Sequence, residues 1–287
     1  MSVVLASSRD ELAASCADRR LTAVVMTMGA LHDGHAELIR AARRRVGSEG
    51  RIIVTDFVNP TQFAPGEDFD RYPRTLDADI DVCAAAGADI VFAPSVEEVY
   101  GTSDLSTLGT QVQIEPSPLG FELEGASRPG HFRGVLTVVA KLMHLTAPDL
   151  AFFGEKDYQQ LTLITQMVRD LRFPIEIVGV ETVRESDGLA LSSRNRYLSE
   201  SERASASLIP QALRAVLAAG AQGEQAALFA GLAIVSQDSS IDLDYLVIRD
   251  LDLSAAPERG SARVLIAARV GSTRLLDNMA MELGGTR

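Results

Sequence analysis

Residues 21–35 read LTAVVMTMGALHDGH. The apolar run over residues 21–27 predicts a buried β-strand, Gly29 permits a tight turn, and Gly34 opens a segment with helical spacing. The first N–H groups of such a helix have no partner within it, and the helix dipole places positive charge at the same end. This segment therefore predicts a strand–turn–helix unit that can bind a phosphate group.

The alternation of strands and helices continues beyond this unit. Short, largely apolar runs at residues 51–57, 88–93, 149–154 and 175–180 are typical of strands, and residues 34–46, 75–86, 136–144 and 158–171 carry helical spacing. Such alternation predicts an α/β fold with a Rossmann-like parallel sheet and helices on both faces. Ligands of these sheets bind beyond the carboxyl ends of the strands, so we expect the chemistry in the loops there.

The pattern changes after about residue 182. Ser199 and Glu202 fit a capping box that opens a helix, and Pro210 is expected to kink or split the Ala-rich segment that contains it. Two strand-like runs follow at residues 242–249 and 263–268. We expect a larger domain over residues 1–182 and a smaller C-terminal α+β domain over residues 183–287.

Composition limits the class of protein. The chain has 287 residues, 46% of them hydrophobic, a mean hydropathy of +0.09, a net charge of −12 and an isoelectric point near 4.8. So acidic a protein does not fit a broad basic face for nucleic acid, and any anion site must be built locally from a few basic groups and helix N-termini. We expect no nucleic-acid partner.

Residues 1–20 carry several charges and no long apolar run, so neither a signal peptide nor a membrane span is expected. Cys16 and Cys83 lack metal-type spacing and are expected to be free thiols. Together these features predict a cytoplasmic protein with no membrane partner.

His32 and His35 are two of only four histidines in the chain. Three positions apart near a helix start, their side chains can point the same way and donate hydrogen bonds to charge that develops on a phosphate. Two surface histidines after an ordinary turn are the alternative. The strand and glycine turn before the pair, and the glycine that opens the helix, favour a functional role.

This H-x-G-H pattern resembles the signature of the nucleotidylyltransferase superfamily, and TMGALHDGH is similar to the version found in the pantothenate synthetase family. Five further segments agree with that family in order: FVNPTQF at 57–63, EDFDRYPR at 67–74, EGASRPGHF at 124–132, FGEKDYQQL at 153–161 and RESDGLALSSRNRYL at 184–198. A weaker similarity follows at residues 244–250 and 273–278. Several segments in one order are more specific than any single motif.

The resemblance implies a set of ATP-binding residues. They are Met28, Gly29, Ala30, Leu31, His32, Asp33, Gly34, His35, Gly154, Glu155, Lys156, Asp157, Val183, Leu191, Ser192, Ser193 and Arg194. Within this set it implies that His35, His32, Lys156 and Arg194 are catalytic, with Lys156 on the phosphates and Val183 as a backbone contact to adenine. Without the resemblance, Lys156 fits a solvated loop lysine equally well, and Ser192–Arg194 fits plain helix-entry chemistry.

The pantoate and β-alanine residues implied are Gln62, Gln160, Asn59 and Arg128. Uncharged amides can hold hydroxyls and a carboxylate without fixing a counter-charge. An Asn-Pro turn accounts for Asn59 by itself but leaves Gln62 unexplained.

The activity implied is an ATP-dependent ligation in pantothenate biosynthesis. Pantoate attacks the α-phosphate of ATP, pyrophosphate leaves, and the amine of β-alanine displaces AMP from the pantoyl adenylate. Mg²⁺ is expected to be held mainly by the ATP phosphates, with Asp79 reaching it through water. The family further implies a homodimer, and the reactive intermediate suggests lids, for which residues 64–74 and the domain at 183–287 are candidates.

Three positions depart from the family pattern. Met26 stands where Pro is usual, and Asp56 is an acid in an otherwise apolar strand, so it must reach solvent, a partner or the site. Ala78 precedes Asp79 where two adjacent acids are expected, and Asp77 is a candidate to compensate.

Three other functions are consistent with parts of the pattern. Another nucleotidylyltransferase would move AMP onto a phosphorylated precursor, but Gln62, Gln160 and the PGHF segment argue against it. A paralogue that only senses nucleotide would be expected to have lost His35 or Lys156. A purely structural α/β domain leaves the polar residues at the loop ends unexplained.

Overall fold

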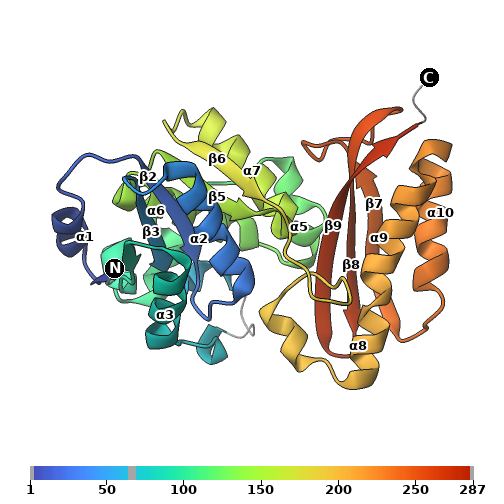
Figure 1. The fold of residues 1–287 in the computed structure, drawn as a ribbon, viewed down its shortest axis with the longest axis horizontal. Coiled ribbons are helices and arrows are strands. Elements are labelled where there is room, and N and C mark those ends of the chain that lie inside the picture. Colours follow the sequence, from blue (N-terminus) through green and yellow to red (C-terminus); the bar gives the residue numbers. More distant parts are fainter. Residues whose placement is uncertain (1–2, 64–68, 285–287) are drawn as a thin grey trace. The chain divides into compact units, whose positions relative to one another are not determined.

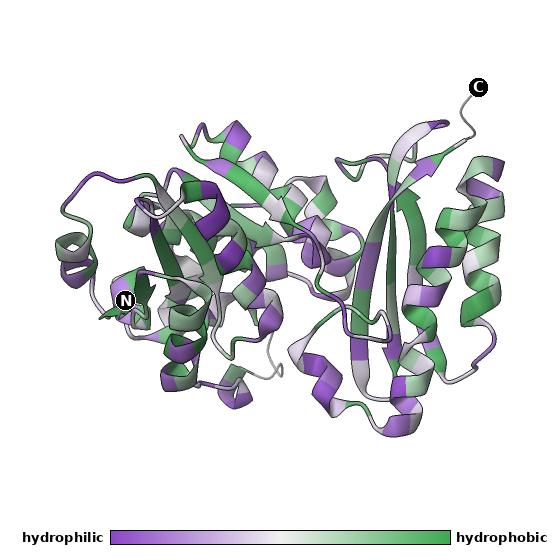
Figure 2. Ribbon diagram, viewed as in Figure 1, coloured by the Kyte–Doolittle hydropathy of each residue, from purple (hydrophilic) through white to green (hydrophobic). Residues whose placement is uncertain are grey.

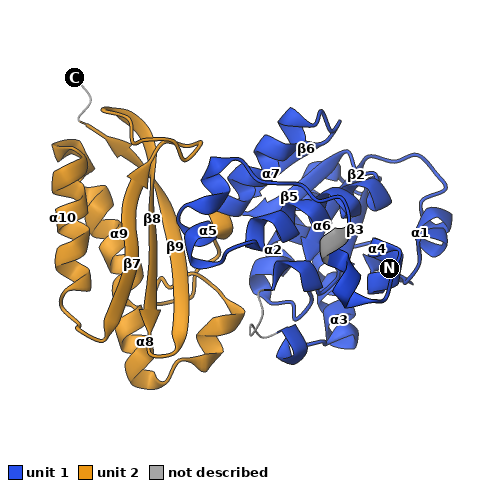
Figure 3. Ribbon diagram, turned by 180° about the vertical axis from the view of Figure 1, so that it is seen from behind, with its two compact units in different colours: residues 1–154, 159–180 blue, residues 155–158, 181–287 orange. Residues whose placement is uncertain are grey.

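The computed structural model describes residues 3–63 and 69–284, and the chain divides into two compact units (Figure 3). Unit 1 comprises Met1–Gly154 and Gln159–Val180, and unit 2 comprises Glu155–Tyr158 and Glu181–Arg287. Of the lid segment expected at residues 64–74, residues 64–68 lie outside the described part of the chain, and Phe69–Arg71 form a 3₁₀ turn.

Unit 1 is built on a six-stranded sheet in the order β1-β4-β3-β2-β5-β6, in which every pairing is parallel (Figure 1). The strands are β1 (Val4–Ala6), β2 (Thr22–Thr27), β3 (Arg51–Asp56), β4 (Ile90–Phe92), β5 (Leu150–Gly154) and β6 (Glu176–Val180). The step from β4 at one side to β5 beside β2 reverses the direction in which strands are added. Ligand sites of such sheets lie at this reversal, next to the carboxyl end of β2.

The helices of unit 1 cover both faces of its sheet, as the sequence predicted. They are α1 (Arg9–Ser15), α2 (Asp33–Val46), α3 (Leu76–Ala86), α4 (Val96–Tyr100), α5 (Glu124–Ser127), α6 (His131–Thr146) and α7 (Tyr158–Asp170). Ala23 and Val25 pack with Ile39 of α2 and Cys83 of α3, whereas Val24 alternates to the opposite face, where α6 contacts β2. Because both faces of the sheet are covered at its centre, the middle residues of β2 to β5 are mostly apolar, and they are green in Figure 2.

The five predicted strands of unit 1 are confirmed within two residues at each end, whereas the short helices α1, α4 and α5 were not predicted and two other features differ from the prediction. Strand β1 was missed because three residues are too few to show a period. Helix α6 begins at His131 rather than at residue 136. Its first turn contains Gly134, a weak helix former, and tertiary packing sets the start instead.

Unit 2 is a three-stranded antiparallel sheet with helices. It contains α8 (Glu200–Ala206), α9 (Leu208–Ala219), α10 (Glu224–Val235), β7 (Ile241–Arg249), β8 (Gly260–Val270) and β9 (Thr273–Leu283), with the strand order β7-β8-β9. The sequence predicted only two strands here. Strand β9 was missed because Asp277 and Asn278, both buried, interrupt its apolar pattern.

The helix-start signals of unit 2 are confirmed. The Ser199 hydroxyl accepts from the Glu202 N–H, and the Glu202 carboxylate accepts from the Ser199 N–H, which completes the capping box. The expected split at Pro210 is also present, since α8 ends at Ala206 and α9 begins at Leu208. Pro210 has no N–H to offer the Ala206 carbonyl, so one continuous helix would lose that bond.

Candidate active site

The turn after β2 is held in an unusual backbone conformation by a buried carboxylate. Gly29 and Ala30 have φ angles of 78° and 53°. The Asp79 side chain, from α3, accepts the Ala30 N–H at 2.9 Å and the Leu31 N–H at 2.7 Å. It also accepts the Thr75 hydroxyl at 3.0 Å. These bonds stabilise the left-handed conformation at Ala30, which an L residue rarely adopts without compensation.

Asp56 lies against the same turn, at the carboxyl end of β3. A Cβ atom on Gly29 would come 2.5 Å from the Asp56 Oδ1 atom, so only glycine fits between the turn and this carboxyl. Burial, together with the charge of Asp79 and a hydrogen bond to it, raises the pKa of Asp56 to about 6. Protonated Asp56 can donate to Asp79, so its partner is a second carboxyl group.

We expect Asp56→Asn to stabilise the protein above pH 6. The folded state holds the Asp56 proton more tightly than the unfolded chain, in which the pKa is near 3.8, so stability falls as pH rises from about 4 to above 6. An Asn side chain donates to Asp79 without titrating, and the gain at pH 7.5 should be about 1–2 kcal/mol.

Urea unfolding of the unchanged protein and of Asp56→Asn at pH 5 and pH 7.5 checks this prediction. The difference in the free energy of unfolding between the two proteins should be larger at pH 7.5 than at pH 5. Equal differences at the two pH values would show that Asp56 does not titrate between them.

His32 and His35 cap the helix α2 reciprocally. The Nδ1 atom of His32 accepts the Gly34 N–H at 3.1 Å, the Nδ1 atom of His35 accepts the His32 N–H at 3.2 Å, and the two ring centroids lie 4.1 Å apart. A ring nitrogen that accepts an N–H bond carries no proton, so each neutral ring has its proton on Nε2. Both Nε2–H groups are thus hydrogen-bond donors at the positive end of the α2 dipole.

A polar cluster forms where β3 leads into the 3₁₀ helix η1 (Pro60–Gln62). The buried Asn59 side chain donates to the Gln62 Oε1 atom at 3.1 Å, and the Gln62 Nε2 atom donates to the Met28 sulfur at 2.7 Å. Tyr100 donates to the Asn59 Oδ1 atom at 2.6 Å. The structure therefore brings the expected pantoate residues Asn59 and Gln62 together with Met28 of the β2 turn.

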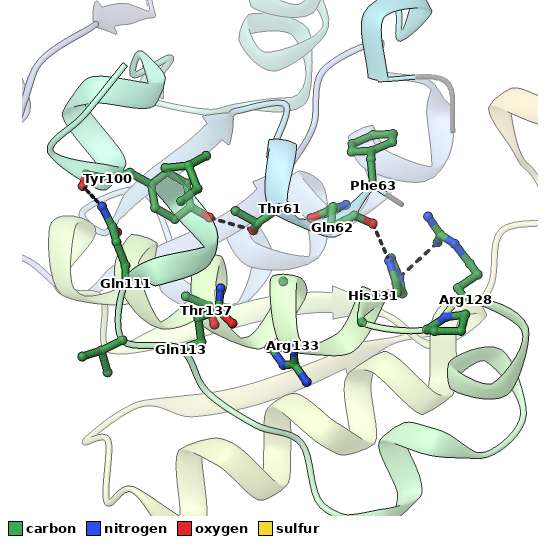
Figure 4. A pocket seen from close by; sticks show the side chains of 15 residues that line it. Thr61, Gln62, Phe63, Tyr100, Gln111, Gln113, Arg128, His131, Arg133 and Thr137 are labelled. Atoms are coloured by element: carbon green, nitrogen blue, oxygen red, sulfur yellow. Dashed lines mark hydrogen bonds between the residues drawn. The ribbon is translucent and has the colours of Figure 1, made fainter. Parts of the chain in front are cut away.

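Arg128 is joined to this cluster through a residue that sequence reasoning did not single out. Arg128 Nη1 lies 3.1 Å from His131 Nε2, and His131 Nδ1 lies 3.0 Å from the Gln62 carbonyl (Figure 4). His131 was visible in the quoted PGHF segment, but a histidine at a helix start has no distinctive pattern. Gln62, Arg128 and His131 also line a cavity of about 190 Å³, together with Thr61, Phe63, Tyr100, Leu108, Gln111, Val112, Gln113, Pro129, Gly130, Arg133, Gly134 and Thr137.

In unit 2, a backbone hydrogen bond links Val183, the expected adenine contact, to the segment Leu191–Arg194, which is also expected to bind ATP. The Leu191 N–H donates to the Val183 carbonyl at 2.9 Å, and Arg184 pairs with Ala190 in an isolated β-bridge. The Ser192 hydroxyl accepts the Arg194 N–H at 3.3 Å and caps the 3₁₀ helix η6 (Ser193–Tyr197). Ser192 therefore has the helix-capping role that was the alternative reading of Ser192–Arg194.

Lys156, Ser192 and Arg194 line one small hollow of about 10 Å³ in unit 2. Arg274 of β9 lines it too, and its guanidinium donates to the Asp244 carboxylate at 2.5 Å. Sequence reasoning missed Arg274, although residues 273–278 carried the weaker similarity. Three cationic side chains therefore gather around one hollow, of which Arg274 is paired with Asp244 and Lys156 lies 3.8 Å from the Asp157 carboxylate.

Two buried partners hold the segment that carries Lys156. The Asn278 side chain donates to the carbonyls of Glu155 and Lys156 at 2.8 and 2.9 Å, and Arg263 pairs with the Glu155 carboxylate at 3.0 Å. These bonds explain why Glu155–Tyr158 groups with unit 2. Of the other expected residues, Gly154 ends β5, Asp157 is exposed, and Gln160 lies in the first turn of α7.

Two observations bear on metals and membranes. Within the described residues, no group of three or more His, Cys, Asp or Glu side chains is placed to hold a metal ion. No helix in the same part of the chain is long and apolar enough to cross a membrane.

A parallel α/β sheet with two histidines capping the helix after β2 defines a nucleotide-binding domain of the H-x-G-H nucleotidylyltransferase class. The chain belongs to the pantoate-beta-alanine ligase family, whose model matches residues 4–280.

Relatives and solved structures agree with this assignment. The chain is 56% identical to a pantothenate synthetase of Salinispora arenicola over 97% of this chain and 95% of the relative. It is 52% identical to the pantothenate synthetase of Mycolicibacterium smegmatis over 94% of this chain and 83% of that relative. The crystal structure of pantothenate synthetase from Thermus thermophilus superposes with a TM-score of 0.88 at 44% identity, covering 96% of this chain and 99% of that one. The crystal structure of a pantoate-beta-alanine ligase from Francisella tularensis, complexed with beta-gamma ATP and beta-alanine, superposes with a TM-score of 0.77 at 34% identity. The match covers 96% of this chain and 97% of that one.

Proposed function

We propose that this chain joins pantoate to β-alanine at the expense of ATP and releases pantothenate, AMP and pyrophosphate. A carboxylate does not accept an amine directly, because oxide would have to leave. Transfer of AMP to the pantoate carboxylate replaces that leaving group. The β-alanine amine then attacks the acyl carbon, and the bond from that carbon to the AMP oxygen breaks.

One geometric observation carries the nucleotide half of this proposal: the reciprocal capping of α2 by His32 and His35. It places two Nε2–H donors and the positive helix end at the carboxyl edge of the sheet. The family match and the named relatives support the choice of pantoate and β-alanine.

The residues of the chain act by alignment and charge stabilisation. His35 and His32 donate to the phosphate oxygens as negative charge moves to the leaving pyrophosphate, and Lys156 and Arg194 of unit 2 supply cations for the same ATP. No side-chain nucleophile is needed. The side chains of Gln62, Asn59, Gln160 and Arg128 are assigned to pantoate and β-alanine.

Mg²⁺ belongs to the same proposal. It would be held mainly by phosphate oxygens of ATP, as Mg²⁺ commonly is in sites that bind a nucleotide. The donor set at the turn fits this arrangement, since both Asp79 oxygens already accept N–H bonds from Ala30 and Leu31. Asp79 holds the turn, and it would act on the ion only indirectly, through water.

Three further expectations stay predictions: residues 183–287 act as a lid over the adenylate, the protein forms a homodimer, and it works in the cytoplasm. The first is checked by small-angle X-ray scattering with and without ATP plus pantoate. An unchanged radius of gyration would argue against closure. Sedimentation equilibrium gives the mass of the oligomer.

Release of AMP and pyrophosphate, measured with ATP, Mg²⁺ and pantoate in the presence and absence of β-alanine, tests the proposed reaction. Steady AMP release should require both acid and amine, and mass spectrometry should find one pantothenate per AMP. Saturable ATP binding without turnover would instead indicate a protein that senses nucleotide.

A further inference from the structure

Gln62 is held from its backbone as well as through its side chain. Its side chain bonds to Asn59 and Met28, but its carbonyl lies 3.0 Å from the His131 Nδ1 atom, in the first turn of α6. A backbone carbonyl can only accept, so His131 Nδ1 is protonated and donates. Figure 4 shows the His131 ring between Gln62 and Arg128.

Arg128 fixes the other side of the same ring. Its Nη1 atom lies 3.1 Å from His131 Nε2, and because a guanidinium can only donate, Nε2 accepts and carries no proton. The two bonds together assign one neutral tautomer to His131. This tautomer is the opposite of the one at His32 and His35, where Nε2 carries the proton.

The first turn of α6 lies directly against the segment that contains Gln62. A Cβ atom on Gly134 would come 2.4 Å from the Thr61 carbonyl oxygen and 2.8 Å from the Gln62 Cα atom. The Gly134 carbonyl in turn accepts from the Asn59 side chain at 3.3 Å. The His131 bond thus acts between two backbone segments that are in close contact, and it adds a direct link from the α6 helix to the Gln62 carbonyl.

The geometry points to His131 as a positioning residue that, through the Gln62 carbonyl and with Arg128 fixing its tautomer, sets the Gln62 side chain for pantoate. The inference rests on the proposed function, because it takes Gln62 as a pantoate ligand. His131 itself need not touch the substrate. Its loss should therefore weaken pantoate binding while the ATP site and the chemical step are left intact.

The test compares His131→Ala, His131→Asn and His131→Gln. Alanine should raise the KM for pantoate roughly tenfold, the size of one net hydrogen bond, with kcat and the KM for ATP within about threefold of the unchanged chain. Asparagine places an amide N–H near the Nδ1 position and should restore most of the affinity. Glutamine places its amide near the Nε2 position and should not.

A matched control lies on the same helix. His144 is exposed in the last turn of α6, with its ring 5.1 Å from that of Phe173, so His144→Ala removes the same atoms far along the helix from Gln62. It should leave the KM for pantoate unchanged. Circular dichroism confirms that each variant is folded, and a variant that does not fold is replaced by the Asn and Gln pair alone.

Pantoate affinity is also measured by calorimetry with a non-hydrolysable ATP analogue. Unaltered affinity in His131→Ala, or equal affinity in the Asn and Gln variants, would overturn the inference. Binding without turnover in the unchanged chain would overturn the proposed reaction but not this inference. No pantoate binding by the unchanged chain would overturn both.

Discussion

His35→Ala is expected to lower kcat for pantoate adenylation about 10²–10³-fold, which corresponds to about 3–4 kcal/mol of transition-state stabilisation. The capping geometry gives the reason. The Nδ1 atom of His35 accepts the His32 N–H, so the ring proton lies on Nε2 at the positive end of α2. A donor there stabilises negative charge that exists only as pyrophosphate departs, so kcat should fall more than the affinity for ATP.

Two further substitutions separate catalysis from capping. His35→Asn keeps an oxygen that can accept the His32 N–H but loses the donor at Nε2, so it should be nearly as slow as the alanine variant. His35→Gln places an amide N–H near Nε2 and should recover part of the rate. Pyrophosphate exchange into ATP, dependent on pantoate, measures this step alone. If the Asn variant exchanges at the normal rate, His35 serves only as a helix cap.

Arg184→Met is expected to lower the free energy of unfolding of unit 2 by about 3–5 kcal/mol. Arg184 donates to both oxygens of Asp277, at 2.6 and 3.0 Å, and the Asp277 side chain is only 1% exposed. Removing the guanidinium leaves a buried carboxylate without its counter-charge. Arg184 also donates to the Gly188 and Asn278 carbonyls, so residues 184–190 lose their attachment to β9.

The control for Arg184 is an exposed pair of similar geometry. Arg133 bonds to both oxygens of Glu115, but the two side chains are 44% and 53% exposed, so Arg133→Met should cost less than about 1 kcal/mol. In a double variant, Arg184→Met with Asp277→Leu, both charges are gone and much of the loss should be recovered. Urea unfolding followed by circular dichroism measures all three. A loss in Arg184→Met no larger than in Arg133→Met would mean that the buried pair contributes nothing.

The parallel sheet could be predicted from sequence because burial on both faces makes each central strand a short, largely apolar run. The turn after β2 was predictable for a local reason as well: Gly29, His32 and Gly34 act within a few residues of one another. Strand β9 was not predictable, because Asp277 and Asn278 are buried polar residues whose partners, Arg184 and the carbonyls of Glu155 and Lys156, are distant in the chain.

The sequence by itself therefore determined the fold class and the family, and it indicated the segments in which we expect the ATP and pantoate residues. Local period, turn chemistry and segment order encode all three. The tertiary structure decided what those side chains do to one another. The proton position on His131, the raised pKa of Asp56 and the bonds of Asp79 to the β2 turn all depend on groups brought together from separate elements. Hydrogen-bond direction and burial act over a few ångströms in space, and distance along the chain does not encode them.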